Sequence, residues 1–408
     1  MQTRSIALSA LLLSVLMLSA CGNADIDNRS TVTVDRSHDT STPPSWQDTT
    51  APDLEYQDYQ IPAGALVTDC DDRHAIYEQS LAQEYPSEAF GILDMETGEH
   101  FEVLGEAINS QRKYSMFSPR IGEGWIAWEE VSPNESSDPN NAEWRLYAAA
   151  LDVENRQIGY PVLVDSGNTS IVARPFYGLS GSRLIWSRNL RPRSVQESSA
   201  HHSRLMSRDL THGAEEVILE STRNWIAVCV SELTTTIIED PEPEERGERI
   251  VVADSRTGDV RYSAQLPKNH NTSHFARAVD GAVLYDAFTN PNEPWPNLYV
   301  ISEDDPPESV RANSMDPVPF GPWLLYEQVV STGPAGHREE VSRLCGMSPA
   351  TREVFVLDET ETGLWQTPLR VSPDTTQTLI AVTLYLSPWV ENQDTPHEIV
   401  RVYRLPGR

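Results

Sequence analysis

The chain has 408 residues, a formal net charge of −30 at pH 7, and 39% hydrophobic residues. The negative charge excludes nucleic-acid binding as a main role, because phosphate backbones attract basic proteins, and it disfavours adhesion to anionic lipid. We attribute the charge to a solvated surface that keeps the protein soluble.

The first 20 residues have the form of a signal peptide. Arg4 precedes an apolar stretch, residues 6–18, that is too short to span a membrane. The following Leu18-Ser19-Ala20-Cys21 resembles the lipobox of bacterial lipoproteins. This resemblance implies that the signal is cleaved before Cys21 and that the cysteine sulfur carries a diacylglycerol. The alternative is an ordinary signal peptide with a chance cysteine.

The lipid would be the only membrane anchor, because no other apolar run approaches the ~20 residues needed to cross a bilayer. We therefore expect an extracytoplasmic protein that is lipid-anchored to the cell membrane or the outer membrane. Residues 21–52 are rich in Ser, Thr, Asp, Asn and Pro and cannot bury enough surface to fold. They are expected to form a flexible tether, which leaves residues 53–408 as one folded domain.

A pattern of two strands recurs about seven times along the chain. An apolar strand with an aromatic or small residue, which we count as the second strand of a four-stranded unit, lies at residues 75–78, 125–128, 184–186, 225–228, 283–285, 323–326 and 379–382. After a polar loop, the third strand of the unit follows at residues 145–147, 204–206, 249–252, 297–300, 343–345 and 398–402. This pattern, with 29 prolines, 21 glycines and no long helical periodicity, predicts an all-β β-propeller with four-stranded antiparallel blades.

The repeat count favours seven blades. Only a few residues separate Leu219 from Trp225, so the fourth unit has little room for an inner strand of its own. A six-bladed or irregular ring is therefore the alternative. The last unit ends at its third strand, and residues 54–61 alternate apolar and polar side chains. We predict that this segment pairs with residues 399–403 as the outer strand and closes the ring.

Short turns at residues 94–98, 209–213 and 254–258 begin with Asp and end with Gly. Asp can accept hydrogen bonds from the amides that follow it, and Gly supplies a positive φ, so we assign these turns a structural role. The hairpins resemble those of TolB-type and quinoprotein-type propeller repeats, and the strand pattern is closer to the TolB-like group. Residues 252–262 match the quinoprotein docking motif only once and imperfectly, which argues against a cofactor. The resemblance implies a fold and a binding tendency but no catalytic residue.

Besides Cys21 there are three cysteines, Cys70, Cys229 and Cys345. They fall in the first, fourth and sixth repeats, and nonadjacent blades are too far apart for disulfides. We expect buried free thiols.

No constellation of residues identifies a reaction. Residues 178–182 miss the Gly-x-Ser-x-Gly pattern of a hydrolase elbow. The acidic turns at residues 69–72 and 138–141 offer oxygen ligands but lack the spacing of a calcium loop. His201 and His202 are adjacent, so on a strand they would point to opposite faces. We expect no catalytic residue, no metal and no cofactor, with calcium or a histidine-bound metal as minor alternatives.

The loops between second and third strands are long and unlike one another, whereas the turns between third and fourth strands are short and similar. Variable insertions on one face of a repeat protein usually mark a binding face. The main basic concentration in this acidic chain lies in one such loop, and arginine suits carboxylates or sulfates. The candidate ligand-binding residues are Arg188, Arg191, Arg193, His201 and His202.

The sequence therefore favours a lipid-anchored, noncatalytic and monomeric propeller whose partner is an envelope protein or polysaccharide. The alternative is a propeller enzyme acting on glycans, a lyase or hydrolase. Convergent His, Asp, Glu or Tyr side chains in one place would favour the enzyme.

Overall fold

A computed structural model describes residues 45–79, 87, 89–133, 138–190, 202–231, 233–241, 247–279, 282–290, 292–302, 306–332, 339–360, 370–373, 379–384 and 397–405. These residues form strands, turns and two one-turn 3-10 helices, η1 Ser110–Arg112 and η3 Pro139–Asn141. Over this part of the chain, no helix has the length and apolar character needed to cross a membrane.

The strands form seven sheets, which we number I to VII along the chain. Sheet I comprises β3 Ala65–Cys70, β4 His74–Gln79, β5 Ala89–Asp94 and β6 His100–Leu104. Sheet II comprises β7 Ser115–Gly122, β8 Trp125–Val131 and β9 Glu143–Asp152, and both β10 Gln157–Ile158 and β11 Val162–Asn168 pair with β9. Sheet III comprises β12 Tyr177–Ser180, β13 Arg183–Leu190, β14 His202–Asp209 and β15 Glu215–Ser221.

Sheets IV and V comprise β16 Trp225–Val230, β17 Thr234–Glu239, β18 Arg249–Asp254 and β19 Val260–Gln265; and β20 Asn271–Val279, β21 Ala282–Phe288, β22 Asn297–Ser302 and β23 Glu308–Arg311. Sheets VI and VII comprise β24 Ser314–Phe320, β25 Trp323–Thr332, β26 Glu339–Ser348, β27 Glu353–Thr360 and β1 Gln47–Asp48; and β28 Arg370–Pro373, β29 Leu379–Leu384, β30 His397–Arg404 and β2 Glu55–Pro62. Within each sheet the main strands are antiparallel, and only β1 pairs in parallel, with β27.

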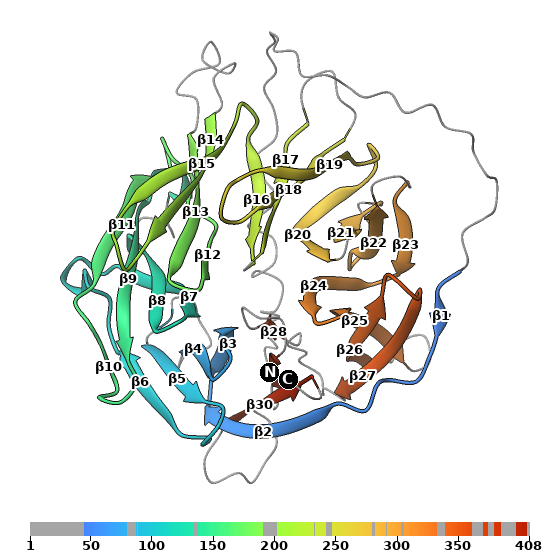
Figure 1. The fold of residues 1–408 in the computed structure, drawn as a ribbon, viewed down its shortest axis with the longest axis horizontal. Helices are drawn as coiled ribbons and strands as arrows, with labels where there is room; N and C mark the ends of the chain where they lie inside the picture. Colours follow the sequence, from blue (N-terminus) through green and yellow to red (C-terminus); the bar gives the residue numbers. More distant parts are fainter. Residues whose placement is uncertain are drawn as a thin grey trace, which may run out of the picture.

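The sheets are arranged around a common axis (Figure 1). The first strand of each sheet is the inner strand, and inner strands of successive sheets contact one another in a cycle that runs β3, β7, β12, β16, β20, β24, β28 and back to β3. The chain is thus an all-β β-propeller with four-stranded antiparallel blades, as predicted.

Hydrophobic clusters lie between neighbouring sheets rather than in one central core. One example joins sheets I and II through Ile76, Phe90, Ile121 and Trp128, and another joins sheets V and VI through Leu284 and Tyr326 among others. The aromatic residues of the second strands supply much of this packing, since Trp128, Trp186, Tyr285 and Tyr326 are fully buried. Each buried aromatic ring removes a large apolar area from water, so the repeated aromatic position holds sheet to sheet.

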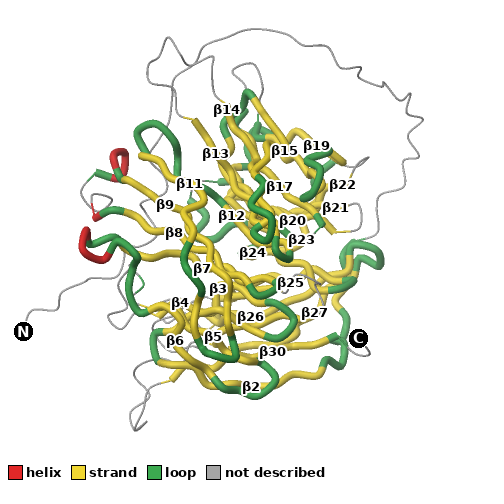
Figure 2. Tube along the Cα trace, turned by 60° about the vertical axis from the view of Figure 1, so that its left-hand side comes forward, coloured by secondary structure: helices red, strands yellow, loops and turns green. Residues whose placement is uncertain are grey.

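The ring closes as the sequence predicts. Strand β2 pairs antiparallel with β30, from Glu55 opposite Arg404 to Pro62 opposite His397, and is the outer strand of sheet VII. In Figures 1 and 2, β2 lies along the rim beside β30. Both ends of the folded domain therefore contribute to one sheet, which leaves no open gap between the last sheet and the first.

The folded body begins earlier than residue 53, the predicted boundary. Gln47 and Asp48 lie in the segment assigned to the tether, yet they form β1 and pair with β27. The reason is local: the Arg352 guanidinium lies 4.9 Å from the ring centre of Trp46, and Arg311 pairs with Asp48. An aromatic ring and a carboxylate fix this end of the segment, although its overall composition is polar.

Sheet IV corrects the strand assignment of the fourth repeat. Residues 225–228 were expected to be a second strand, but β16 is the inner strand of its sheet. The second strand is β17, whose Thr234-Thr235-Thr236-Ile237-Ile238 run lies where the repeat pattern predicts the polar loop between residues 225–228 and 249–252. This run is rich in β-branched residues, which favour strands, but it lacks the aromatic residue of the other repeats. Sheet IV therefore has an inner strand of its own, β16.

The predicted turns and thiols are confirmed. Asp94 Oδ1 accepts the amides of Glu96 and Thr97, Asp254 does the same for Arg256 and Thr257, and the closing glycines have φ between 72° and 77°. Cys70, Cys229 and Cys345 are buried thiols that form no disulfide within the described part of the chain.

Candidate functional site

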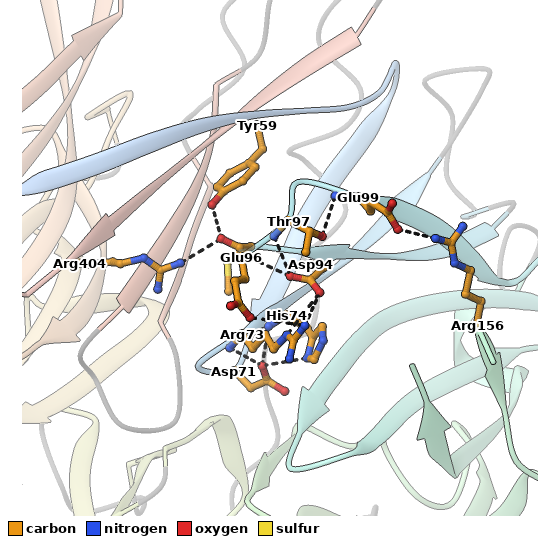
Figure 3. A network of polar contacts seen from close by, with 11 residues as sticks. Tyr59, Asp71, Arg73, His74, Asp94, Glu96, Thr97, Glu99, Arg156 and Arg404 are labelled. Atoms are coloured by element: carbon orange, nitrogen blue, oxygen red, sulfur yellow. Dashed lines mark hydrogen bonds and ion pairs between the residues drawn. The ribbon is translucent and has the colours of Figure 1, made fainter. Parts of the chain in front are cut away.

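The seam where the ring closes carries a dense polar network (Figure 3). The Tyr59 hydroxyl on β2 donates to the backbone oxygen of Met95, and Nη2 of Arg404 on β30 donates to the same oxygen at 3.1 Å. Met95 lies in the turn between β5 and β6. One carbonyl of sheet I thus accepts from both strands that bring the chain ends together, so this part of the network fastens sheet VII to sheet I.

Asp94 and Arg73 stabilise the same turn between β5 and β6. Arg73 Nη2 lies 2.9 Å from Asp94 Oδ2, while Asp94 Oδ1 accepts two amides of the turn. Burial alone would raise the pKa of Asp94, but the hydrogen bonds from Arg73 and the amides outweigh it and hold that pKa below its usual range. Asp94 is therefore a charged structural residue at neutral pH.

Asp71 and His74 form a second pair in the seam. Asp71 Oδ1 accepts the amides of Arg73 and His74 at 2.9 and 2.6 Å, and Nδ1 of His74 lies 3.5 Å from the same oxygen. The Nε2 atom of His74 is buried and makes no hydrogen bond within the described residues. The Asp71 carboxylate already accepts two backbone amides, so we assign Asp71 and His74 a structural role in the turn that joins β3 to β4.

A second group of polar side chains links neighbouring sheets near the axis. Glu78 on β4 of sheet I accepts the amide of Ser118 on β7 of sheet II at 3.3 Å, and also the Ser87 hydroxyl at 3.0 Å. Ser118 has a φ of 50° and lies in a bulge of the inner strand. A bulge removes an amide from the regular ladder, and the buried carboxylate of the preceding sheet supplies an acceptor for it.

Sheets V and VI repeat this arrangement. Asp286 on β21 accepts the amide of Asp316 on β24 at 3.1 Å, and Asp316 again has a positive φ, 53°, within a bulge. In both cases the acidic residue directly follows the buried aromatic residue of the second strand, and a proline follows the bulged residue. The recurrence identifies a structural device that joins one sheet to the next.

Glu129 occupies the same position in sheet II but binds a side chain. The Arg174 guanidinium donates to Glu129 through Nε at 3.0 Å and Nη2 at 2.7 Å, and it lies 4.8 Å from the ring centre of Phe117. The adjacent Tyr177 hydroxyl donates to Ser118 O at 2.7 Å, and burial together with Glu129 raises the pKa of this phenol. Tyr177 therefore stays protonated as a hydrogen-bond donor at neutral pH.

Asp69 on the inner strand β3 has a raised pKa. Its oxygens accept the amides of Cys70 at 3.0 Å and Ile121 at 3.1 Å. Burial raises the pKa of Asp69 to about 7, against the opposing effects of Arg120 and these amides. Arg120 in turn donates to Thr68 O at 2.8 Å. A carboxyl that titrates near neutrality between two inner strands couples their packing to pH.

The predicted ligand-binding loop is only partly described. Arg188 lies on β13, and its Nη1 is 2.8 Å from Oδ1 of Asp165, a buried carboxylate that also accepts Nε1 of Trp186 at 2.9 Å. This makes Arg188 part of the contact between sheets II and III. His202 is exposed at the start of β14, whereas Arg191, Arg193 and His201 lie outside the described residues, as does Cys21. Within the described residues, no group of three or more His, Cys, Asp or Glu side chains could hold a metal ion.

Sequence reasoning missed the buried carboxylates. The signal was present as an acidic residue directly after the aromatic one in Tyr77-Glu78, Trp128-Glu129, Tyr285-Asp286 and Tyr326-Glu327. All four acidic residues are buried. Carboxylates are rarely buried without partners, so their recurrence at one position of a strand pattern predicts a repeated acceptor role.

No model of a known protein family and no curated protein matches this sequence. Among solved structures, the chain is similar to the β-propeller domain of the trilobed protease from Pyrococcus furiosus, with 13% identity, a TM-score of 0.43, and coverage of 67% of this chain and 78% of that chain. It is also similar to an oligogalacturonate lyase from Vibrio parahaemolyticus, with 11% identity, a TM-score of 0.49, and coverage of 89% and 99%.

A third similar structure is an acylaminoacyl peptidase from Pyrococcus horikoshii, with 11% identity and a TM-score of 0.44. That match covers 67% of this chain and 43% of the peptidase. At such low identity these likenesses concern the fold and transfer neither a reaction nor a ligand. The propeller assignment follows from the sheet topology of the chain itself.

Proposed function

We propose that this protein is a lipid-anchored, noncatalytic β-propeller that binds a protein or polymer of the cell envelope. One observation supports this most directly: the connections from second to third strands are long and differ between sheets, while the opposite turns are short. The long connections comprise residues 80–88, 132–142, 191–201, 240–248, 289–296, 333–338 and 385–396, and the short ones residues 95–99, 153–156, 210–214, 255–259, 303–307 and 349–352.

Each of the seven sheets is one blade in this proposal. A ring fastened at its seam by β2, Tyr59 and Arg404 gives the variable connections a rigid support. Binding surfaces built on rigid scaffolds lose less conformational entropy when a ligand binds. The anchor is the lipid on Cys21 that the lipobox implies, and the location is the cell membrane or outer membrane, facing away from the cytoplasm.

Electrostatics favour an anionic partner for the loop between β13 and β14. Arg191 and Arg193 lie three and five residues after the ion-paired Arg188. Because Arg188 neutralises the buried Asp165, replacing it would leave that carboxylate without its cation, at a cost in stability. The ligand role is therefore proposed for Arg191, Arg193, His201 and His202, and Arg188 is excluded from the test.

The test compares the protein with a variant carrying Arg191→Ser and Arg193→Ser. Binding to an acidic polysaccharide should weaken severalfold at low salt and become less dependent on salt, because local attraction must act against the charge of the whole chain. Arg183→Ser is the matched control, since Arg183 pairs with Glu216 at the opposite end of sheet III. Unchanged affinity of the double variant would rule out this loop as the binding site, and turnover of the polysaccharide would favour the glycan-enzyme alternative.

A further inference from the structure

Strand β1 fixes the end of the ring at which the N-terminal segment leaves. The Gln47 amide donates to Arg352 O at 3.0 Å, and Gln47 is opposite Glu353, the first residue of β27. Arg352 belongs to the short turn between β26 and β27. Since β1 runs parallel to β27, Gln47 at the start of β1 lies at the same end as this turn.

All turns from third to fourth strands lie at that end, which we call the turn end. Every sheet has the same inner-to-outer order, and outer strands lead to the next inner strand, so successive sheets repeat the same direction. Contacts between neighbouring turns agree with this: Arg156 of sheet II pairs with Glu99 of sheet I, and Arg352 of sheet VI pairs with Glu308 of sheet V. The variable connections emerge at the opposite end, the loop end.

We infer that the turn end faces the lipid surface and that the loop end faces away from it. This inference rests on the proposed lipid anchor at Cys21. The anchor and the first described residues are joined by residues 22–44, and the tether that the composition of these residues predicts would span about 26 Å on average. The two ends of the ring are separated by at least the length of a strand, roughly 23 Å for the seven residues of β15.

If the loop end lay on the membrane, Gln47 at the turn end would stand above the membrane by the length of a strand plus the height of the connections at the loop end. The tether would then have to stay extended to its average span or beyond, whereas the opposite orientation needs no extension. Chain entropy therefore favours contact at the turn end. The variable loops are left free for a partner approaching from outside the membrane.

The experiment uses the two ends of one strand as a matched pair. His212 precedes β15 at the turn end and Thr222 follows β15 at the loop end, and both residues are exposed. Lipidated full-length His212→Cys and Thr222→Cys variants are labelled with a donor fluorophore and reconstituted into phosphatidylethanolamine and phosphatidylglycerol vesicles containing an acceptor-labelled lipid. The buried native thiols are checked by labelling the parent protein.

Energy transfer to the lipid should be about twofold greater from position 212 than from position 222, given their separation along the strand. Equal transfer, or greater transfer from position 222, in protein that floats with the vesicles would overturn the orientation while leaving the anchor intact. Failure of the lipidated protein to float would instead overturn the proposed anchor, and with it the orientation. A Cys21→Ala protein that floats equally well would have the same meaning.

Discussion

At the scale of single residues, buried acids in this protein connect sheets. Glu78 and Asp286 each accept an amide from a bulged residue of the next inner strand. A buried carboxylate is costly unless it is paired, and here the acceptor and the amide released by the bulge satisfy each other. We therefore expect that a variant that loses the carboxylate also loses the regular structure of the bulge it binds.

Asp286→Ala should lower the free energy of unfolding by about 1–3 kcal/mol, because the Asp316 amide would lose its acceptor in a partly buried position. Urea denaturation followed by tryptophan fluorescence measures the change. Asp286→Asn is the control, since its amide oxygen can still accept this hydrogen bond, and its loss should be smaller. An alanine variant that unfolds at the parental urea concentration would contradict the linking role.

Asp69 predicts a pH dependence of stability near neutrality. Burial raises its pKa to about 7 in the folded protein, whereas an unfolded Asp has a pKa near its ordinary value of about 3.9. The folded state thus binds the proton more tightly, and stability should fall as pH rises between these two values. Melting temperatures from pH 5 to pH 8 should decrease less in Asp69→Asn than in the parent. Parallel pH profiles for the two proteins would show that Asp69 does not titrate in this window.

At the scale of elements, the closing strand is the most informative. Tyr59 and Ile61 of β2 pack with Val67, Tyr77 and Val400 of sheets I and VII, so β2 supplies hydrogen bonds on one side and apolar contacts on the other. A propeller whose last sheet lacked this strand would expose both an edge and this cluster.

Deleting residues 53–61 should lower the melting temperature by several degrees, because burying each large apolar side chain contributes about 1.5–3 kcal/mol. Differential scanning calorimetry measures the shift. Tyr59→Phe is the comparison variant, since it removes the hydrogen bond to Met95 but keeps the strand. Its melting temperature should fall much less than that of the deletion variant. If the deletion and the point variant melted alike, β2 would contribute little to closure.

The same elements show how far the sequence could be read. Aromatic second strands and the alternating segment at residues 54–61 predicted the sheets and their closure, because burial imposes both patterns. Sheet IV was misassigned because β17 carries no aromatic residue. The role of Arg188 could not be predicted, since Asp165 lies on the outer strand of another sheet and no local pattern connects them. Trp46 and Arg352 were missed for the same reason.

At the scale of the whole molecule, the net charge and the sheet topology bear on how the proposed membrane attachment and partner binding are separated. A formal charge of −30 disfavours contact between the protein surface and anionic lipid. The N-terminal segment leaves the ring from the rim strand β1. In the proposed arrangement, attachment through one lipidated residue and recognition through the opposite end do not compete for the same surface.

Membrane association should depend on Cys21 alone. A single lipid-bearing residue supplies the apolar contact in this proposal, and the acidic ring would favour release once that contact is lost. Cys21→Ala should move the protein from the membrane fraction to the soluble fraction, as judged by immunoblotting after high-speed centrifugation. Its melting temperature should equal that of the parent, because the first contacts of the folded body begin near Trp46. A variant that stayed in the membrane fraction after a high-salt wash would place the anchor elsewhere in the chain.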